Sequence, residues 1–157
     1  MQKIVPFLWF DDQAEQAVKF YTSIFENSKA GRIAHYSGAG PGPKGKVMTV
    51  SFQLEGLEFT ALNGGPEFPF TEAISFVVNC ETQAEVDYFW EKLSEEGEKG
   101  QCGWLKDKFG VSWQIVPTIL LKMLDDPDAE KASRVAKTML QMTHLDIQKL
   151  KQAYEQG

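Results

Sequence analysis

The segment CGWLKDKFGVSWQIVP, residues 102–117, decides the fold. It predicts two strands, Cys102–Lys106 and Val111–Val116, because apolar and polar residues alternate on both sides of a turn-forming sequence. The turn is Asp107–Gly110, with glycine at its last position. The segment is therefore a β-hairpin, and the remaining chain must supply the elements that pack on it.

Side chains alternate between the two faces along the second strand of this hairpin. Val111, Trp113 and Ile115 share one face, which is apolar and must be buried. Gln114 lies in the middle of the other face. What this single amide contacts is the central functional question.

Length and composition exclude several classes of protein. A chain of 157 residues with 43% hydrophobic residues fits one globular domain. A net charge of −6 argues against nucleic-acid binding, which needs clustered Lys and Arg. No apolar run is long enough to span a membrane. Two cysteines, Cys80 and Cys102, form no disulfide framework and indicate a reducing, cytoplasmic location.

One pattern of elements occurs twice. The first copy comprises predicted segments at 4–10 (strand), 13–26 (helix), 29–36, 47–54 and 57–63 (strands). The second comprises a strand at 74–80, a helix ending near residue 97, and the strands of the 102–116 region. In an alignment of the two copies, Ile4–Glu15 corresponds to Ile74–Glu85, and Gly56-Leu57 corresponds to Gly110-Val111. Thr60 then corresponds to Gln114. The sequence therefore predicts two βαβββ modules.

Capping residues mark the expected helix starts. Asp12 with Glu15, and Thr82 with Glu85, have capping-box spacing. Further helices are expected from Asp126-Pro127 and from Asp146. Residues 118–157 are thus predicted to be a helical C-terminal extension of the same domain, whose modules occupy 3–66 and 70–117.

The repeat also predicts which faces are buried. Alternate residues of the two leading strands are apolar and are expected to lie under the helices: Ile4, Pro6, Leu8 and Phe10, and Ile74, Phe76, Val78 and Cys80. The opposite faces mix polar and aromatic residues, among them Phe7, Trp9, Thr60, Ser75 and Gln114. The predicted fold class is α+β, with the modules forming a cupped mixed sheet lined by these residues.

The helix sequence AEQAVKFYTSIF (14–25) and the block from Phe70 to Pro117 carry a family resemblance. They resemble the vicinal oxygen chelate superfamily of glyoxalases, extradiol dioxygenases and bleomycin- and fosfomycin-resistance proteins. Within it they are similar to the PhnB-like group, whose members are described as demethylubiquinone methyltransferase-like. The resemblance implies the paired-module fold and a homodimer, but one scaffold of this kind supports many chemistries.

Metalloenzymes of the superfamily place one His, Gln or Glu ligand on the first and last strand of each module. The resemblance carries these positions to Val5, Thr60, Ser75 and Gln114, of which only Gln114 is a ligand type. His35 and His144 lie elsewhere. A divalent cation needs three or four donors, so we expect neither a metal nor another cofactor. Metal-dependent lyase, isomerase or dioxygenase chemistry is the alternative, and methyl transfer is the second.

We expect a small amphiphilic or aromatic molecule to bind in the cup. Gln114, Ser75 and Thr60 would orient it, with Phe7 and Trp9 as apolar walls. The alternative for Gln114 is a buried amide whose hydrogen bonds are satisfied by Ser or Thr neighbours across the sheet. Trp104 is a further candidate wall or a core residue, because its strand face is undetermined. Whether the protein is an enzyme is left open.

Two further features have competing interpretations. Glu58 is a candidate general base if the cup raises its pKa, or a rim glutamate that reaches water. The loop SGAGPGPKGK (37–46) contains part of a phosphate-binding motif. Its prolines lack N–H groups and a strand follows it, which favours a flexible lid over a nucleotide site.

Overall fold

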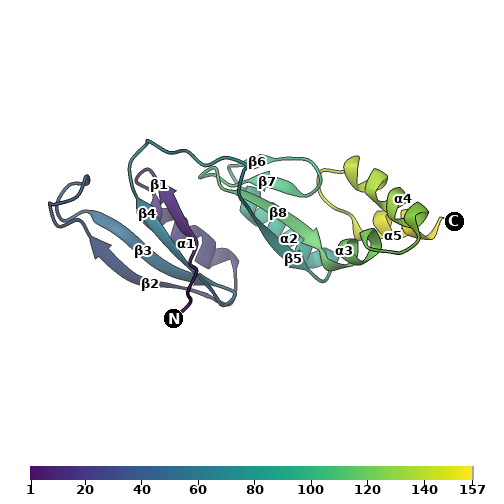
Figure 1. Ribbon diagram of the computed structural model, residues 1–157, viewed down its shortest axis with the longest axis horizontal. Helices are drawn as coiled ribbons and strands as arrows, with labels where there is room; N and C mark the ends of the chain where they lie inside the picture. The colour runs from purple at the N-terminus through teal and green to yellow at the C-terminus, as the bar shows by residue number, and fades with distance from the viewer. Residues whose placement is uncertain (157) are drawn as a thin grey trace. The chain divides into compact units, whose positions relative to one another are not determined.

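The computed structural model describes residues 1–156 and shows an α+β protein with two four-stranded mixed sheets (Figure 1). The chain divides into two compact units, of which the first is Met1–Phe70 and the second begins at Thr71. The first unit contains β1 (Phe7–Phe10), α1 (Ala14–Ile24), β2 (Ser28–His35), β3 (Val47–Leu54) and β4 (Leu57–Asn63). The second contains β5 (Ser75–Cys80), α2 (Gln83–Ser94), β6 (Glu98–Lys99), β7 (Trp104–Lys106), β8 (Ser112–Pro117), α3 (Thr118–Leu124), α4 (Ala129–Leu140) and α5 (Ile147–Glu155).

The two sheets have the same topology. Their strand orders are β1-β4-β3-β2 and β5-β8-β7-β6, so the first and last strands of each module are neighbours. These neighbours, β1 with β4 and β5 with β8, run parallel, and the other pairs are antiparallel. The predicted pair of βαβββ modules is therefore confirmed.

Each module buries one face of its sheet under its own helix. In β1, Leu8 and Phe10 are buried, whereas Phe7 is exposed. In β8, Trp113 and Ile115 are buried as predicted. We call the opposite face of each sheet its mixed face, because aromatic and polar side chains alternate onto it.

The leading strands are shorter at their start than predicted. Ile4 and Ile74 were expected to lie under the helices, but they are 83% and 73% exposed. The parallel ladders begin only at Phe7 and Ser75, so the preceding residues lie beyond the area that the helices cover.

The start of α1 is capped from a distant strand. Asp12 was predicted to be its N-cap, but the cap position is Gln13, which makes no side-chain capping bond. Asn63, the last residue of β4, accepts a hydrogen bond from the Ala14 N–H at 2.8 Å through its Oδ1. The local capping box is wrong here because a tertiary contact satisfies the helix terminus.

The predicted N-cap at Thr82 is confirmed, because Thr82 accepts a hydrogen bond from the Glu85 N–H at 3.2 Å. The other half of the predicted capping box differs: the Glu85 carboxylate accepts a bond at 3.1 Å from the N–H of Glu81, one residue before the cap, and not from that of Thr82. Asp146 likewise caps α5. The helix expected from Asp126-Pro127 instead begins after Asp128, whose carboxylate accepts from the N–H groups of Glu130 and Lys131.

The hairpin of residues 102–117 is held from both ends. Cys102 and Gly103 have positive φ and donate their N–H groups to the carbonyls of Met142 and Thr143, so β7 begins at Trp104 and not at Cys102. The buried Asp107 carboxylate accepts bonds from the Val111 N–H and from the Trp113 indole, at 3.1 and 2.9 Å.

The C-terminal helices α3, α4 and α5 pack within the second unit. They form a core with the end of β8 that contains Val116, Leu120, Met123, Val135, Leu145 and Leu150. None of the helices within residues 1–156 is long and apolar enough to cross a membrane.

Candidate functional site

Gln114 lies at the centre of the mixed face of the second sheet. It pairs with Val77 of β5 on one side and with Trp104 of β7 on the other. Paired residues point to the same face, so Trp104, whose face the sequence leaves undetermined, shares this face with Gln114. Gln114 donates a hydrogen bond from Nε2 to the Ser75 hydroxyl at 2.9 Å. The structure thus brings together all three predicted site residues of this unit.

Ser112 occupies the next position on the same face, two residues before Gln114. It pairs with Ser75 and with Lys106. Its side chain is 1% exposed, and its Oγ has no hydrogen-bond partner among residues 1–156. The alternation of β8 predicted its face, but nothing in the sequence predicted that it would be buried without a partner.

Ser112 contributes to a pocket of about 140 Å³ beside β7. Trp104 and Lys106 also line it, together with Glu72 from the segment before β5. Lys106 and Glu72 form an ion pair, and each holds the pKa of the other away from its ordinary value: that of Lys106 is raised and that of Glu72 is lowered. The pocket therefore has an aromatic wall, a buried hydroxyl and an exposed ion pair.

The mixed face of the first sheet carries the other predicted residues. Phe7 and Thr60 are partners in the β1–β4 ladder, and Trp9 lies two residues further along β1. Trp9 donates its indole N–H to the Gly65 carbonyl at 2.9 Å and meets the Phe68 ring edge-on at 4.9 Å. Phe7 is 59% exposed. Phe7 and Trp9 thus provide an apolar wall beside the Thr60 hydroxyl.

Glu58 is on the same face of β4 as Thr60 and is exposed. Its backbone N–H and carbonyl both bond to the Gln2 side chain, at 3.1 Å each. A role as general base stays a prediction, as do the ligand contacts expected for the six other site residues.

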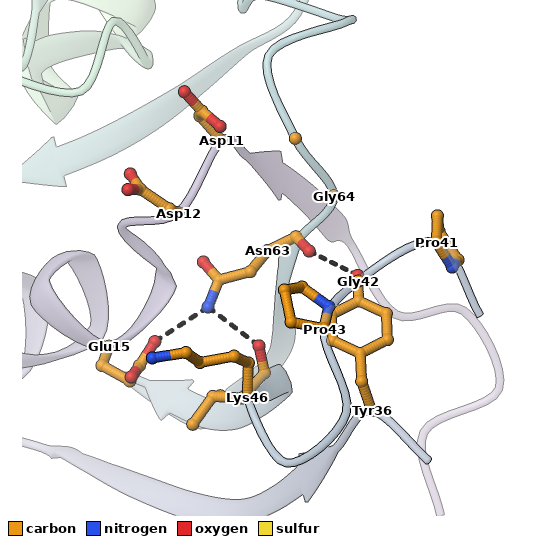
Figure 2. Close-up of a pocket in the computed structure, with 12 residues that line it drawn as sticks. Asp11, Asp12, Glu15, Tyr36, Pro41, Gly42, Pro43, Lys46, Asn63 and Gly64 are labelled. Carbon is orange, nitrogen blue, oxygen red and sulfur yellow. Dashed lines mark hydrogen bonds between the residues drawn. The ribbon is translucent and has the colours of Figure 1, made fainter. Parts of the chain in front are cut away.

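A second pocket, of about 510 Å³, lies at the end of the first sheet where β1 and β4 finish (Figure 2). The loop at 37–46 contributes Pro41, Gly42 and Pro43 to its lining. Tyr36 holds the loop: its hydroxyl donates to the Asn63 carbonyl at 2.5 Å, and a side chain at Gly42 would collide with its ring. The 37–46 loop therefore lines this end of the first module, and its role as a lid stays a prediction.

Asn63 organises the polar side of this pocket, and sequence reasoning missed it. Besides capping α1, its Nδ2 donates to Glu15 at 2.9 Å and to the Val47 carbonyl at 3.1 Å (Figure 2). An asparagine that ends a strand gives no local signal of this role, because its partners are up to 49 residues away.

The four positions that the superfamily uses for metal ligands do not fit a metal here. Ser75 and Gln114 bond to each other, and Val5 and Thr60 supply no carboxylate, imidazole or thiolate. Within residues 1–156 no three His, Cys, Asp or Glu side chains are grouped so that they could hold an ion. The residues of the two mixed faces instead offer hydroxyl and amide groups beside aromatic rings.

Methyl transfer would require S-adenosylmethionine, and the fold does not fit the usual nucleotide site for it. Such sites follow a parallel strand with a Gly-rich turn into a helix. Here β1 is followed by Asp11-Asp12-Gln13, and β5 by Glu81-Thr82. The residues at both strand ends lack that turn.

Comparison with known proteins agrees with the fold. The family model described as 3-demethylubiquinone-9 3-methyltransferase matches residues 2–116. A PhnB protein from Bacillus cereus whose structure carries the same methyltransferase description is 40% identical, covers 74% of this chain and 100% of its own, and has a TM-score of 0.67. A search of the curated proteins finds no match.

More distant structures share the fold alone. A protein from Pseudomonas aeruginosa is 21% identical over 74% of this chain and 98% of its own, with a TM-score of 0.60. The fosfomycin resistance protein FosX from Listeria monocytogenes is 15% identical over 80% of this chain and 98% of its own, with a TM-score of 0.55. Another FosX structure contains Mn(II) and sulfate. The chain therefore belongs to the PhnB-like 3-demethylubiquinone-9 3-methyltransferase family, and it shares its fold with FosX.

Proposed function

We propose that this protein binds a small amphiphilic or aromatic molecule on the mixed face of each sheet, with no metal ion among the ligand's contacts. The observation that carries the proposal is the arrangement around Gln114. Its NH₂ group is held by Ser75, while its carbonyl oxygen has no partner among the described residues. An oriented acceptor beside Trp104 is typical of small-molecule sites, which combine apolar walls with a few placed polar groups.

The first module supports the same proposal with different groups. Thr60 offers a hydroxyl, and Phe7 presents an exposed ring beside it. Trp9 is fixed by its bond to Gly65, so the wall that it forms is rigid. A rigid aromatic wall loses little conformational entropy when a ligand binds.

The test is a fluorescence titration with anilinonaphthalene sulfonate, an amphiphilic aromatic dye. Trp9→Ala and Gln114→Ala, singly and combined, should weaken binding, because they remove a wall and the oriented amide. Tyr88→Ala is the matched control, since Tyr88 is an aromatic residue that is 41% exposed on α2. Equal binding by the double variant and the control would disprove the assignment.

Metal independence has its own measurement. Dye binding should be unchanged by EDTA, and elemental analysis of the purified protein should find no stoichiometric Zn, Ni, Mn or Fe. A stoichiometric ion whose removal abolishes binding would instead support divalent-metal chemistry of the superfamily type.

We also propose that the protein is a cytoplasmic homodimer. Leu121 and Leu140 on the C-terminal helices are 55% and 60% exposed, which favours a partner surface there. The free thiols of Cys80 and Cys102 favour a reducing compartment. Sedimentation velocity at micromolar concentration should show a dimer, and Leu121→Glu with Leu140→Glu should dissociate it.

A further inference from the structure

We propose that the Ser112 pocket is a subsite for a single neutral aromatic ring that carries a hydroxyl or carbonyl oxygen. The inference rests on the proposed function, because it names the ligand class for the mixed face of the second sheet. It starts from an exception: most buried hydroxyl groups in proteins are hydrogen-bonded. The Ser112 hydroxyl is buried and has no partner in the described chain.

The contrast with the larger pocket of Figure 2 shows why Ser112 is informative. There, the Asn63 amide and the Tyr36 hydroxyl are both engaged in bonds within the protein. Around Ser112 the neighbouring polar groups are engaged as well: Ser75 accepts from Gln114, and Lys106 pairs with Glu72. Among the described polar groups around it, Ser112 alone keeps both its donor and its acceptor capacity, so a ligand atom that reaches it in the pocket can use either.

The size of the pocket limits what can enter. Its volume is about 140 Å³. A cavity of about 150 Å³ accommodates one benzene ring, so the volume of this pocket matches a single six-membered ring. Trp104 lies on the same face and lines the pocket, and aromatic rings attract one another in offset or edge-on geometry. Ring and hydroxyl together select an oxygen-bearing monocyclic compound.

The charges around the pocket favour a neutral ligand. Two acidic residues, Glu72 and Glu98, and two basic ones, Lys99 and Lys106, line it. Lys106 pairs with Glu72, and Lys99 pairs with Glu91 at 3.2 Å. Of the four charged residues described on this lining, only Glu98 has no ion-pair partner, and it lies near Lys106. The lining therefore offers little charge to neutralise a charged ligand. A phenol that keeps its proton meets these conditions.

The probes are para-fluorophenol and para-fluorotoluene, which have similar size but differ in the oxygen. Binding to the full chain is followed by fluorine NMR titration. The wild type should bind the phenol more tightly than the toluene. Ser112→Ala should weaken phenol binding by about 2- to 10-fold, the effect of one neutral hydrogen bond, and leave toluene binding unchanged. Trp104→Ala should weaken both.

Ser23→Ala is the matched control, because Ser23 is an exposed serine on α1 in the other unit and should change neither probe. Ser112→Cys, which is close in shape and a weak donor, serves if Ser112→Ala fails to fold. The proposal is overturned if para-fluorophenol shows no binding at millimolar concentration, or if the Ser112 variants bind it like the wild type. If the dye still requires Gln114 in that case, only the subsite fails; if dye binding is also independent of Gln114 and Trp9, the proposed function fails as well.

Discussion

Replacing Asn63 should destabilise the protein much more than replacing Asp12, although sequence pattern assigns the helix cap to Asp12. The Asn63 side chain accepts a bond from the Ala14 N–H at 2.8 Å and donates to Glu15 at 2.9 Å and to Val47 at 3.1 Å. Loss of a helix cap costs about 0.5–2 kcal/mol. Each further neutral hydrogen bond contributes about 0.5–1.5 kcal/mol.

The contributions of these three bonds are summed, with a smaller value for the bond to Glu15 because it is exposed. On this sum, Asn63→Ala should lower the free energy of unfolding by about 2–3 kcal/mol. In a chain of this size that corresponds to a decrease in Tm of roughly 5–10 °C. Asp12 makes no capping bond to α1, so Asp12→Ala should lose no more than the ~0.5 kcal/mol of a charge near a helix amino end.

The assay is thermal and urea denaturation followed by circular dichroism, with both variants at the same protein concentration. Asn63→Asp provides a finer test, because it keeps the acceptor for Ala14, loses both donated bonds and places its carboxylate against that of Glu15; any stability that it retains over Asn63→Ala is then due to the cap. If Asp12→Ala proved as damaging as Asn63→Ala, the cap would be local, and the reasoning that β4 supplies it would be refuted.

Three other predictions follow from single contacts. Ser112→Ala should raise the free energy of unfolding by about 1 kcal/mol in ligand-free protein, because it removes an unpaired buried hydroxyl; a lower Tm would show that the hydroxyl has a partner in solution. Gly42→Ala should cost about 1 kcal/mol by displacing the Tyr36 ring, whose nearest atom would lie 2.2 Å from the new Cβ; an unchanged Tm would contradict this packing. Burial raises the pKa of the Cys80 thiol from 9.0 to about 12, with Glu85 and Glu81 adding to it. The folded chain therefore keeps this proton where the unfolded chain loses it, so stability should fall as pH rises from 9.0 toward 12, and iodoacetamide should modify Cys80 near pH 9.0 only after denaturant is added.

Hydrophobic periodicity was sufficient to predict most of the fold. The bounds predicted for the strands at 47–54 and 57–63 agree with β3 and β4, and the repeat predicted two modules with the same order of elements along the chain. These features depend on local alternation, which a sequence displays directly. The overextended starts at Ile4 and Ile74 arose because apolar residues continue beyond the last ladder partner.

The missed features depend on contacts between distant segments. Cys102 takes a positive φ because the backbone around Met142 and Thr143 accepts the N–H groups of the 102–103 turn. Asp107 is a different case, because its partners are the Trp113 indole and the backbone of its own hairpin. Its burial was missed because a charged residue in a turn sequence is normally expected at the surface.

The candidate site shows the same division. Alternation predicted that Gln114 and Ser75 point to mixed faces, and the sequence repeat predicted that Thr60 is the equivalent of Gln114 in the first module. The burial of Ser112 could not be predicted, because it depends on residues from three other segments that include Glu72 and Trp104. Sequence therefore identified the face, and tertiary packing identified the described hydroxyl on it that is buried without a partner.

The two modules share a framework but not their chemistry. Where the first has Phe7 beside Thr60, the second has Val77 beside Gln114. The two modules also differ at the carboxyl ends of their strands. In the first module this end carries a pocket lined by the 37–46 loop. In the second, α3 follows β8 directly, and Thr118 donates a hydrogen bond to Glu81 at 3.2 Å. α3 and the Thr118–Glu81 bond hold β8 at its carboxyl end, and Asp107 holds the hairpin at the amino end of β8. Gln114 and Ser112 thus stand on a strand held at both ends, which is the rigidity that a site for a small ring requires.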